Sequence, residues 1–169
     1  RPPRPSGASN FRSRCRSLRF DGLSDAAMDA ILRAEAPTLS TAEIEALVRA
    51  GEGSPGRALR YAGLSLAEIE KALHALASHG DADNRERLAL VKQLSLKSAR
   101  PRYEAFLERA PAFIAQAARH RTGAGLGQAL HHWEAARKLA TGAVILALEP
   151  GAVIFELAGH VAALARDAA

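Results

Sequence analysis

Apolar residues recur at helical spacing along most of this 169-residue chain, and this pattern constrains its fold more than any other feature. Alanine, the strongest helix former, fills 38 positions, whereas aromatic residues make up only 5% of the chain. Serine, proline and glycine divide the pattern into segments of helical length. The sequence therefore predicts an all-α protein.

Three short helices are predicted between about residues 24 and 63. Each has about three turns and a narrow apolar stripe, so none is expected to be stable unless it packs on the others. We expect residues 21–64 to form a small three-helix domain. Each helix is preceded by a serine that can cap it: Ser24, Ser40 with Glu43 in a capping box, and Ser54 directly before Pro55.

Residues 65–169 are predicted to form a bundle of five longer helices, enough for an independent core. The signals for the first three are Ser65 with Glu68, Asp83 with Glu86, and Pro101. Two further helices are expected at about 128–147 and 151–166, separated by Pro150 and Gly151.

Two positions in this bundle predict irregular backbone. Pro111 lies inside the apolar stripe that runs from Tyr103 to Ala117, and an internal proline predicts a kink or a break. Gly123, Gly125 and Gly127 predict a loose connection. Trp133 and the stripe from Tyr103 to Phe113 are expected to be largely buried, as aromatic residues at helical spacing usually are.

One segment, residues 16–20, alternates polar and apolar side chains as a half-buried strand does. A single strand has no partner within this chain. Such a strand is unusual in a complete domain and typical of a fragment cut from a sheet.

The positive charge is concentrated at the N-terminus. The chain has 23 Lys and Arg against 18 Asp and Glu, a formal net charge of +5. Six arginines and no acid lie in residues 1–20, so these carry +6 and the remainder carries −1. A prediction of nucleic-acid binding from charge therefore applies only to this arm.

Several protein classes are excluded by composition. The single cysteine, Cys15, excludes an intramolecular disulfide framework and a multi-cysteine zinc site, and it favours a reducing compartment. No apolar run approaches the roughly 20 residues that span a bilayer. The N-terminal arginines are not followed by the apolar stretch of a secretory signal. We expect a soluble, cytoplasmic protein without a membrane partner.

Motifs that perform chemistry are absent from the sequence. Gly51 to Gly56 matches G-x-G-x-x-G, but a dinucleotide site needs a preceding strand, and the preceding segment is predicted to be a helix. The segment is better explained as a turn between two helices. The six histidines form no H-E-x-x-H motif, so no metal site is expected, and there is no nucleophile elbow or P-loop.

The run Arg12-Ser13-Arg14-Cys15-Arg16 has two interpretations. It is either a solvated basic arm or a rigidly presented arginine at a subunit interface. In the second case the planar guanidinium can reach a nucleotide bound by a neighbour and stabilise charge on the transferring phosphoryl group.

Three segments together resemble the clamp-loader subunits of bacterial DNA polymerase III, which are AAA+ proteins, and in particular the delta-prime subunits. Residues 12–16, followed by Leu18-Arg19-Phe20 and Leu23-Ser24-Asp25, resemble the Ser-Arg-Cys region of sliding-clamp loaders. Gly53 to Leu59 is similar to the motif that opens the third helix of their lid domain. Trp133 to Arg137 and Leu148 to Leu157 resemble the C-terminal collar helices of delta-prime subunits. The resemblance covers about residues 11–169.

The resemblance implies an architecture and an assembly. Residues 1–20 would include a remnant of the AAA+ α/β core, residues 21–64 the lid, and residues 65–169 a collar that packs subunits into a ring. The implied partners are the gamma/tau and delta subunits in a hetero-oligomer that loads the sliding clamp on primed DNA. The chain itself would hold no cofactor and have no catalytic activity, and ATP would be bound by neighbouring subunits.

The resemblance also assigns residues. Arg14 falls at the position of the arginine finger that acts in trans, and Ser13 and Cys15 would orient its turn. Gly53, Ser54 and Arg57 belong to the lid motif, although Gly56 stands where ATP-hydrolysing subunits usually have the arginine. This departure suits a delta-prime subunit and leaves a sensing role for Arg57 open. Residues 1–9 do not match the family and would be a divergent segment, an artificial extension or a proteolytic end.

A second interpretation is a helical adaptor protein, unrelated to clamp loaders, whose basic N-terminal arm binds nucleic acid through phosphates.

Overall fold

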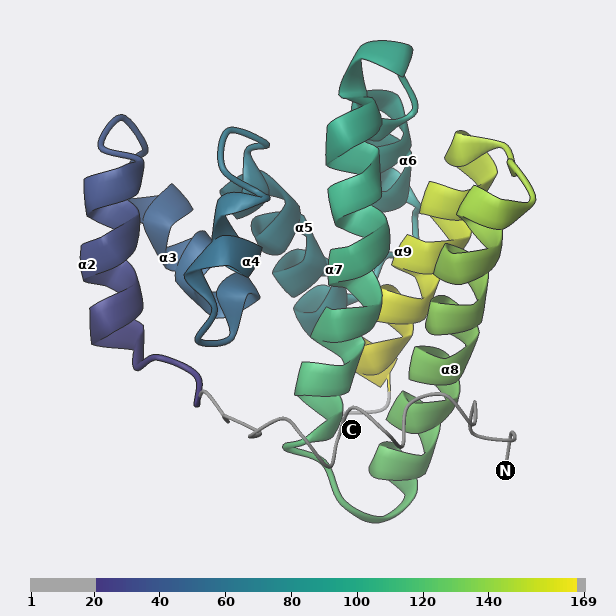
Figure 1. Cartoon of the computed structure of the whole chain (residues 1–169). Coiled ribbons are helices and arrows are strands. Elements are labelled where there is room, and N and C mark those ends of the chain that lie inside the picture. Colours follow the sequence, from purple (N-terminus) through teal and green to yellow (C-terminus); the bar gives the residue numbers. More distant parts are fainter. Residues whose placement is uncertain (1–20, 167–169) are drawn as a thin grey trace, which may run out of the picture.

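The computed structural model describes residues 21–166, and every regular element in that range is a helix (Figure 1). The all-α prediction is therefore confirmed for this part of the chain. The basic arm, the predicted strand at 16–20 and the expected AAA+ remnant at 1–20 lie outside the described residues.

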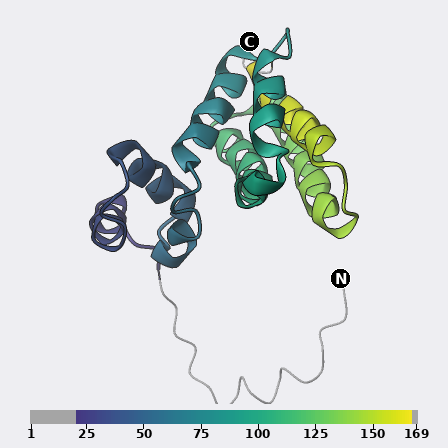
Figure 2. The ribbon, with the colours of Figure 1, turned by 90° about the horizontal axis from the view of Figure 1, so that it is seen from above.

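Among the described residues, three short helices of 5 to 11 residues come first and five helices of 10 to 23 residues follow. Figure 2 shows the short helices to one side of the bundle formed by the others. The short helices are α2 (Asp25–Glu35), α3 (Thr41–Gly51) and α4 (Pro55–Leu59). The bundle contains α5 (Leu66–His79), α6 (Arg85–Leu94), α7 (Arg100–Ala118), α8 (Gly123–Ile145) and α9 (Pro150–Arg166), with a 3₁₀ turn, η1 (Lys97–Ala99), before α7.

Helix α9 lies at the centre of the bundle and packs against α5, α6, α7 and α8. Its sequence is apolar over much of its circumference, as expected for a helix with neighbours on several sides. Ile154, Leu157 and Val161 are fully buried. The core continues into α7 through Phe106 and Ile114, which are also fully buried.

The three short helices have a smaller core, made by Met28 and Leu32 of α2, Ile44 and Leu47 of α3, and Ala58 of α4. Helix α3 also packs against α5, which connects this group to the bundle. The short helices are therefore stabilised by burying apolar residues against one another and, through α3, against α5, because they are too short to be stable alone.

All three serine caps predicted for the short helices are present. The hydroxyl oxygens of Ser24, Ser40 and Ser54 each accept a hydrogen bond from the backbone N–H three residues later, at 3.4, 3.2 and 3.4 Å. Pro55 is the first residue of α4, where its missing N–H costs nothing.

The cap predicted for α5 is wrong, and the cap predicted for α6 is only partly right, because Asp83 accepts a hydrogen bond from the N–H of Arg85 at 3.3 Å but is not the main capping group. Ser65 has a left-handed backbone (φ 53°) and its side chain caps nothing. The Glu43 carboxylate, which the predicted capping box would turn back onto α3, instead accepts from the N–H of Ala67 at 2.7 Å and caps α5. At α6 the main capping group is Asp81, which accepts from the N–H groups of Glu86 and Arg87 at 3.0 and 3.1 Å.

The structure contains neither the break predicted at Pro111 nor the loop predicted at the three glycines. Helix α7 continues through Pro111, which is itself buried, so tertiary packing supports the helix where the backbone bond is missing. The three glycines do not form a loop, because α8 begins at Gly123 and contains Gly125 and Gly127.

The aromatic residues are less uniformly buried than predicted. Phe106 and Phe113 are buried as expected, whereas Tyr103 and Trp133 are only partly buried at the edge of the core. The Arg137 guanidinium lies over the Trp133 ring, 5.3 Å from its centre, and shields one face of the indole.

Candidate functional site

The predicted site residues fall into two sets. Arg14, Ser13 and Cys15 lie outside the described residues. Gly53, Ser54 and Arg57 lie together in the turn between α3 and α4 and in the first turn of α4.

Gly53 fixes the path of the chain that leads into the three-helix group. Its φ is 80°, and a Cβ at this position would lie 2.7 Å from the Cα of Gly22. The N–H of Leu23 donates to the carbonyl of Gly53 at 2.9 Å. Only glycine combines this backbone conformation with so close an approach. The segment before α2 is therefore held directly against the α3–α4 turn.

This turn does not form a dinucleotide-binding loop. The helix α3, not a strand, precedes it, which confirms the interpretation of the G-x-G-x-x-G match as a turn between helices. Gly56 lies within α4, and nothing lies within 4 Å of a Cβ built there. The glycines therefore serve the backbone geometry of the turn.

Arg57 extends from α4 back across the turn. Its guanidinium donates to the Glu52 carboxylate at 2.7 Å. Partial burial opposes the charged form, but the hydrogen bond and charge of Glu52, together with Tyr61, raise the pKa of Arg57. An anion that bound here would have to replace Glu52.

A polar cluster that the sequence did not reveal connects α4 to α7. The Glu108 carboxylate accepts from the Arg60 guanidinium at 2.7 Å and from the Tyr61 hydroxyl at 2.5 Å. Tyr61 is only 3% exposed, and burial together with the Glu108 charge raises its pKa. These partners are almost fifty positions apart in the chain, so no local pattern indicates their contact.

A buried ion pair joins α5 to α7. The Arg109 guanidinium donates to the Glu70 carboxylate at 2.7 Å, and both residues are almost fully enclosed. Helical spacing does indicate their position, because each lies three or four residues from buried apolar residues of its own helix. The pair supports the packing of two helices and does not face a cavity large enough for a substrate.

The most exposed apolar side chains gather where α8 ends. Val144, Ile145, Leu146 and Leu148 are 66, 75, 68 and 38% exposed, and we call them the α8-end surface. Leu96, beside η1, is 59% exposed. Isolated apolar residues on a surface are ordinary, but a contiguous group of this kind marks an interaction site.

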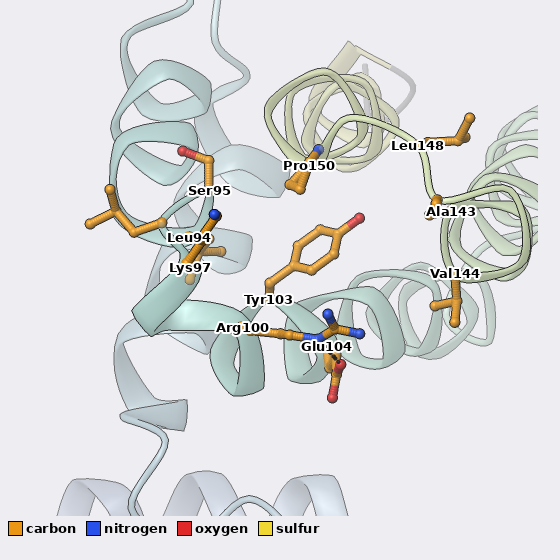
Figure 3. A pocket seen from close by; sticks show the side chains of 12 residues that line it. Leu94, Ser95, Lys97, Arg100, Tyr103, Glu104, Ala143, Val144, Leu148 and Pro150 are labelled. Atoms are coloured by element: carbon orange, nitrogen blue, oxygen red, sulfur yellow. Dashed lines mark hydrogen bonds and ion pairs between the residues drawn. The ribbon is translucent and has the colours of Figure 1, made fainter.

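A pocket of about 270 Å³ opens beside this surface (Figure 3). Val144 and Leu148 line one side and Leu94 and Ser95 the other, and Lys97 adds positive charge. The Tyr103 side chain occupies the middle of the view, and its hydroxyl is buried without a hydrogen-bond partner. Burial and the nearby Glu149 charge raise the pKa of Tyr103, so the phenol stays neutral.

This arrangement is suited to binding a macromolecule through apolar contact. Apolar side chains make up most of the pocket lining, together with Lys97 and the ion pair of Arg100 and Glu104, whose atoms are 3.0 Å apart. Comparison with protein-family models, with curated proteins and with solved structures gives no match for the chain. No helix among the described residues is both long enough and apolar enough to cross a membrane.

Proposed function

We propose that this chain supplies the lid and collar of a clamp-loader subunit of the delta-prime type. In this role residues 21–64 form the lid, and residues 65–169 form a collar that assembles with gamma/tau and delta subunits. The assembly uses ATP bound by neighbouring subunits to place the sliding clamp on primed DNA.

The observation that carries the proposal is the α8-end surface. A five-helix bundle has enough helices to bury its apolar residues, yet four large ones stay exposed within five consecutive positions at the end of α8. A collar subunit requires such a surface, because it must bury apolar side chains against neighbouring subunits.

The α3–α4 turn adds support. Gly53 holds the chain that leads into α2 in a fixed position, which is the connection through which residues 1–20 would reach a neighbour. In this proposal Arg14 is the arginine finger, Ser13 and Cys15 orient it, and Arg57 stays bound to Glu52.

Co-elution with the motor subunits tests the assembly. The chain is mixed with polymerase III gamma/tau and delta subunits and passed over a size-exclusion column, together with Ile145→Asp and Leu88→Asp variants. Leu88 is a matched control, because it is 56% exposed on α6, away from the α8-end surface. We expect the natural chain and Leu88→Asp to co-elute with the motor subunits and Ile145→Asp to elute alone.

Absence of co-elution for the natural chain would contradict the proposal. If that chain bound DNA instead, with an affinity that falls steeply with salt, the adaptor interpretation would replace it. A second test addresses Arg14 within the assembled loader. Arg14→Ala should reduce the DNA-stimulated ATPase by removing turnover at the one neighbouring site that Arg14 reaches, while assembly is unchanged. Unchanged turnover would remove the arginine-finger assignment.

A further inference from the structure

Two histidines from neighbouring helices meet at the contact between α8 and α9. The Nδ1 atoms of His132 on α8 and His160 on α9 are 3.2 Å apart, and their ring centres are separated by 5.5 Å. Both residues are partly buried. Packing of the two helices, not a flexible loop, therefore sets the distance between the nitrogens.

This separation is close to the spacing that a metal ion imposes. Zinc binds imidazole nitrogen at about 2.0–2.1 Å in tetrahedral geometry, which places two such nitrogens about 3.3 Å apart. Without an ion, one Nδ1–H must donate to the other Nδ1. If the donor ring moves its proton to Nε2, both Nδ1 lone pairs can bind one cation, and no net proton is released.

A third side chain that can bind a metal lies on the same helix as His160. Glu156 lies one turn before His160 on α9, so its exposed carboxylate shares the same helix face.

We propose that His132 and His160 form a chelating pair for a divalent transition-metal ion of the zinc type, with Glu156 as the third ligand. Imidazole nitrogen with one carboxylate suits zinc, nickel and copper better than magnesium or calcium. No group of three or more His, Cys, Asp or Glu in residues 21–166 is already arranged around a single point. The Glu156 side chain must therefore change rotamer, and water completes the coordination. The site is independent of the proposed role in clamp loading.

Zinc titration of the whole chain tests the site. Every protein carries Cys15→Ser, because the only thiol of the chain could bind zinc by itself. Isothermal calorimetry and thermal unfolding are measured for this background and for His132→Gln, His160→Gln, Glu156→Gln and His120→Gln. His120 is the matched control, since it is exposed and lies between α7 and α8.

We expect one zinc ion per chain. We also expect Tm to rise by about 5 °C or more when zinc exceeds its dissociation constant a hundredfold. His132→Gln and His160→Gln should each weaken zinc binding at least tenfold, whereas His120→Gln should leave it unchanged. Absence of saturable binding, or binding that survives His160→Gln, would overturn the proposal. Unchanged affinity in Glu156→Gln would remove Glu156 as a ligand.

A measurement that leaves all three proposed ligands in place guards against ligand variants that fail to fold. In NMR spectra of the same Cys15→Ser chain, zinc should shift the imidazole signals of His132 and His160 before that of His120. Equal shifts at all histidines would indicate unspecific binding and would overturn the chelating pair.

Discussion

At the scale of single residues, Glu70 and Arg109 form the most deeply buried ion pair among the described residues. Each charge has been removed from water, and a hydrogen bond of 2.7 Å compensates that loss. The exposed pair of Glu68 and Arg102 joins the same two helices at the same distance. Burial, not distance, distinguishes the two, so only the buried pair should matter strongly for stability.

Removing one partner of the buried pair should therefore be far more damaging than removing one partner of the exposed pair. Glu70→Ala leaves the Arg109 guanidinium buried without its carboxylate and should lower the free energy of unfolding by about 3–5 kcal/mol. Glu68→Ala should cost at most about 1 kcal/mol. Urea unfolding followed by circular dichroism measures both.

The double variant Glu70→Met with Arg109→Leu separates the loss of the ion pair from the effect of an uncompensated charge. It should recover most of the stability lost in Glu70→Ala, because no charge then remains in the core. If Glu70→Ala and Glu68→Ala lowered the free energy of unfolding equally, burial of the ion pair would make no difference to stability.

At the scale of helices, local sequence signals predicted which segments are helical better than they predicted the groups that cap each helix. The serines before α2, α3 and α4 could be identified because an N-cap acts on an N–H three residues away. Glu43 could not be identified as the cap of α5, because it reaches Ala67 from another helix. The same physics explains Pro111 and the glycines of α8, where tertiary packing outweighs local propensity.

The candidate site shows the same division. The turn at Gly53 and the cap at Ser54 are local and were predicted from sequence. The α8-end surface was not predicted. Helical spacing identifies the apolar residues of α8, but it does not show which of them α9 leaves uncovered. The contact of His132 with His160 also depends on how two helices pack, so the sequence predicted only dispersed histidines.

Asp81, just before α6, should make the stability of the folded protein depend on pH in the acid range. Burial alone would raise the pKa of Asp81, but the N–H groups of Glu86 and Arg87 and the Arg87 guanidinium hold the pKa below its ordinary value. A carboxyl group whose pKa is lower in the folded state contributes stability that is complete above its unfolded pKa of about 3.9. That stability is lost as pH falls below this value, through the lower folded pKa.

The Asp81→Asn variant isolates this contribution. It should lower the free energy of unfolding by about 1–2 kcal/mol at neutral pH, because an amide caps two N–H groups less well than a carboxylate. Between pH 5 and pH 3 the natural chain should lose more stability than the variant. Urea unfolding across this pH range checks the slope, and parallel curves would contradict the role of Asp81. The Asp83→Asn variant is the comparison at the same helix start: Asp83 is exposed and accepts one longer bond, from the N–H of Arg85 at 3.3 Å, so its loss should cost less than that of Asp81.

At the scale of the whole molecule, the described residues form two groups of helices that differ in how many neighbours enclose them. Helix α9 is enclosed by four other helices, whereas α2 contacts only its two short neighbours closely. The three-helix group depends on α3 packing against α5 and on the polar cluster of Arg60, Tyr61 and Glu108.

Weakening that cluster should therefore release the short helices while the bundle stays folded. Glu108→Ala removes the acceptor of the Tyr61 hydroxyl and leaves a polar group unsatisfied at a site that is 3% exposed, which costs about 1–3 kcal/mol. We expect hydrogen exchange, followed by mass spectrometry, to become faster in α2–α4 and to remain unchanged in α8 and α9. Adding Tyr61→Phe should restore much of the protection, because the unsatisfied hydroxyl is then gone.

Glu104→Ala, which breaks only the exposed pair with Arg100 on α7, should change hydrogen exchange in neither group of helices. Faster exchange throughout the chain in Glu108→Ala would instead mean that the two groups unfold as one cooperative unit.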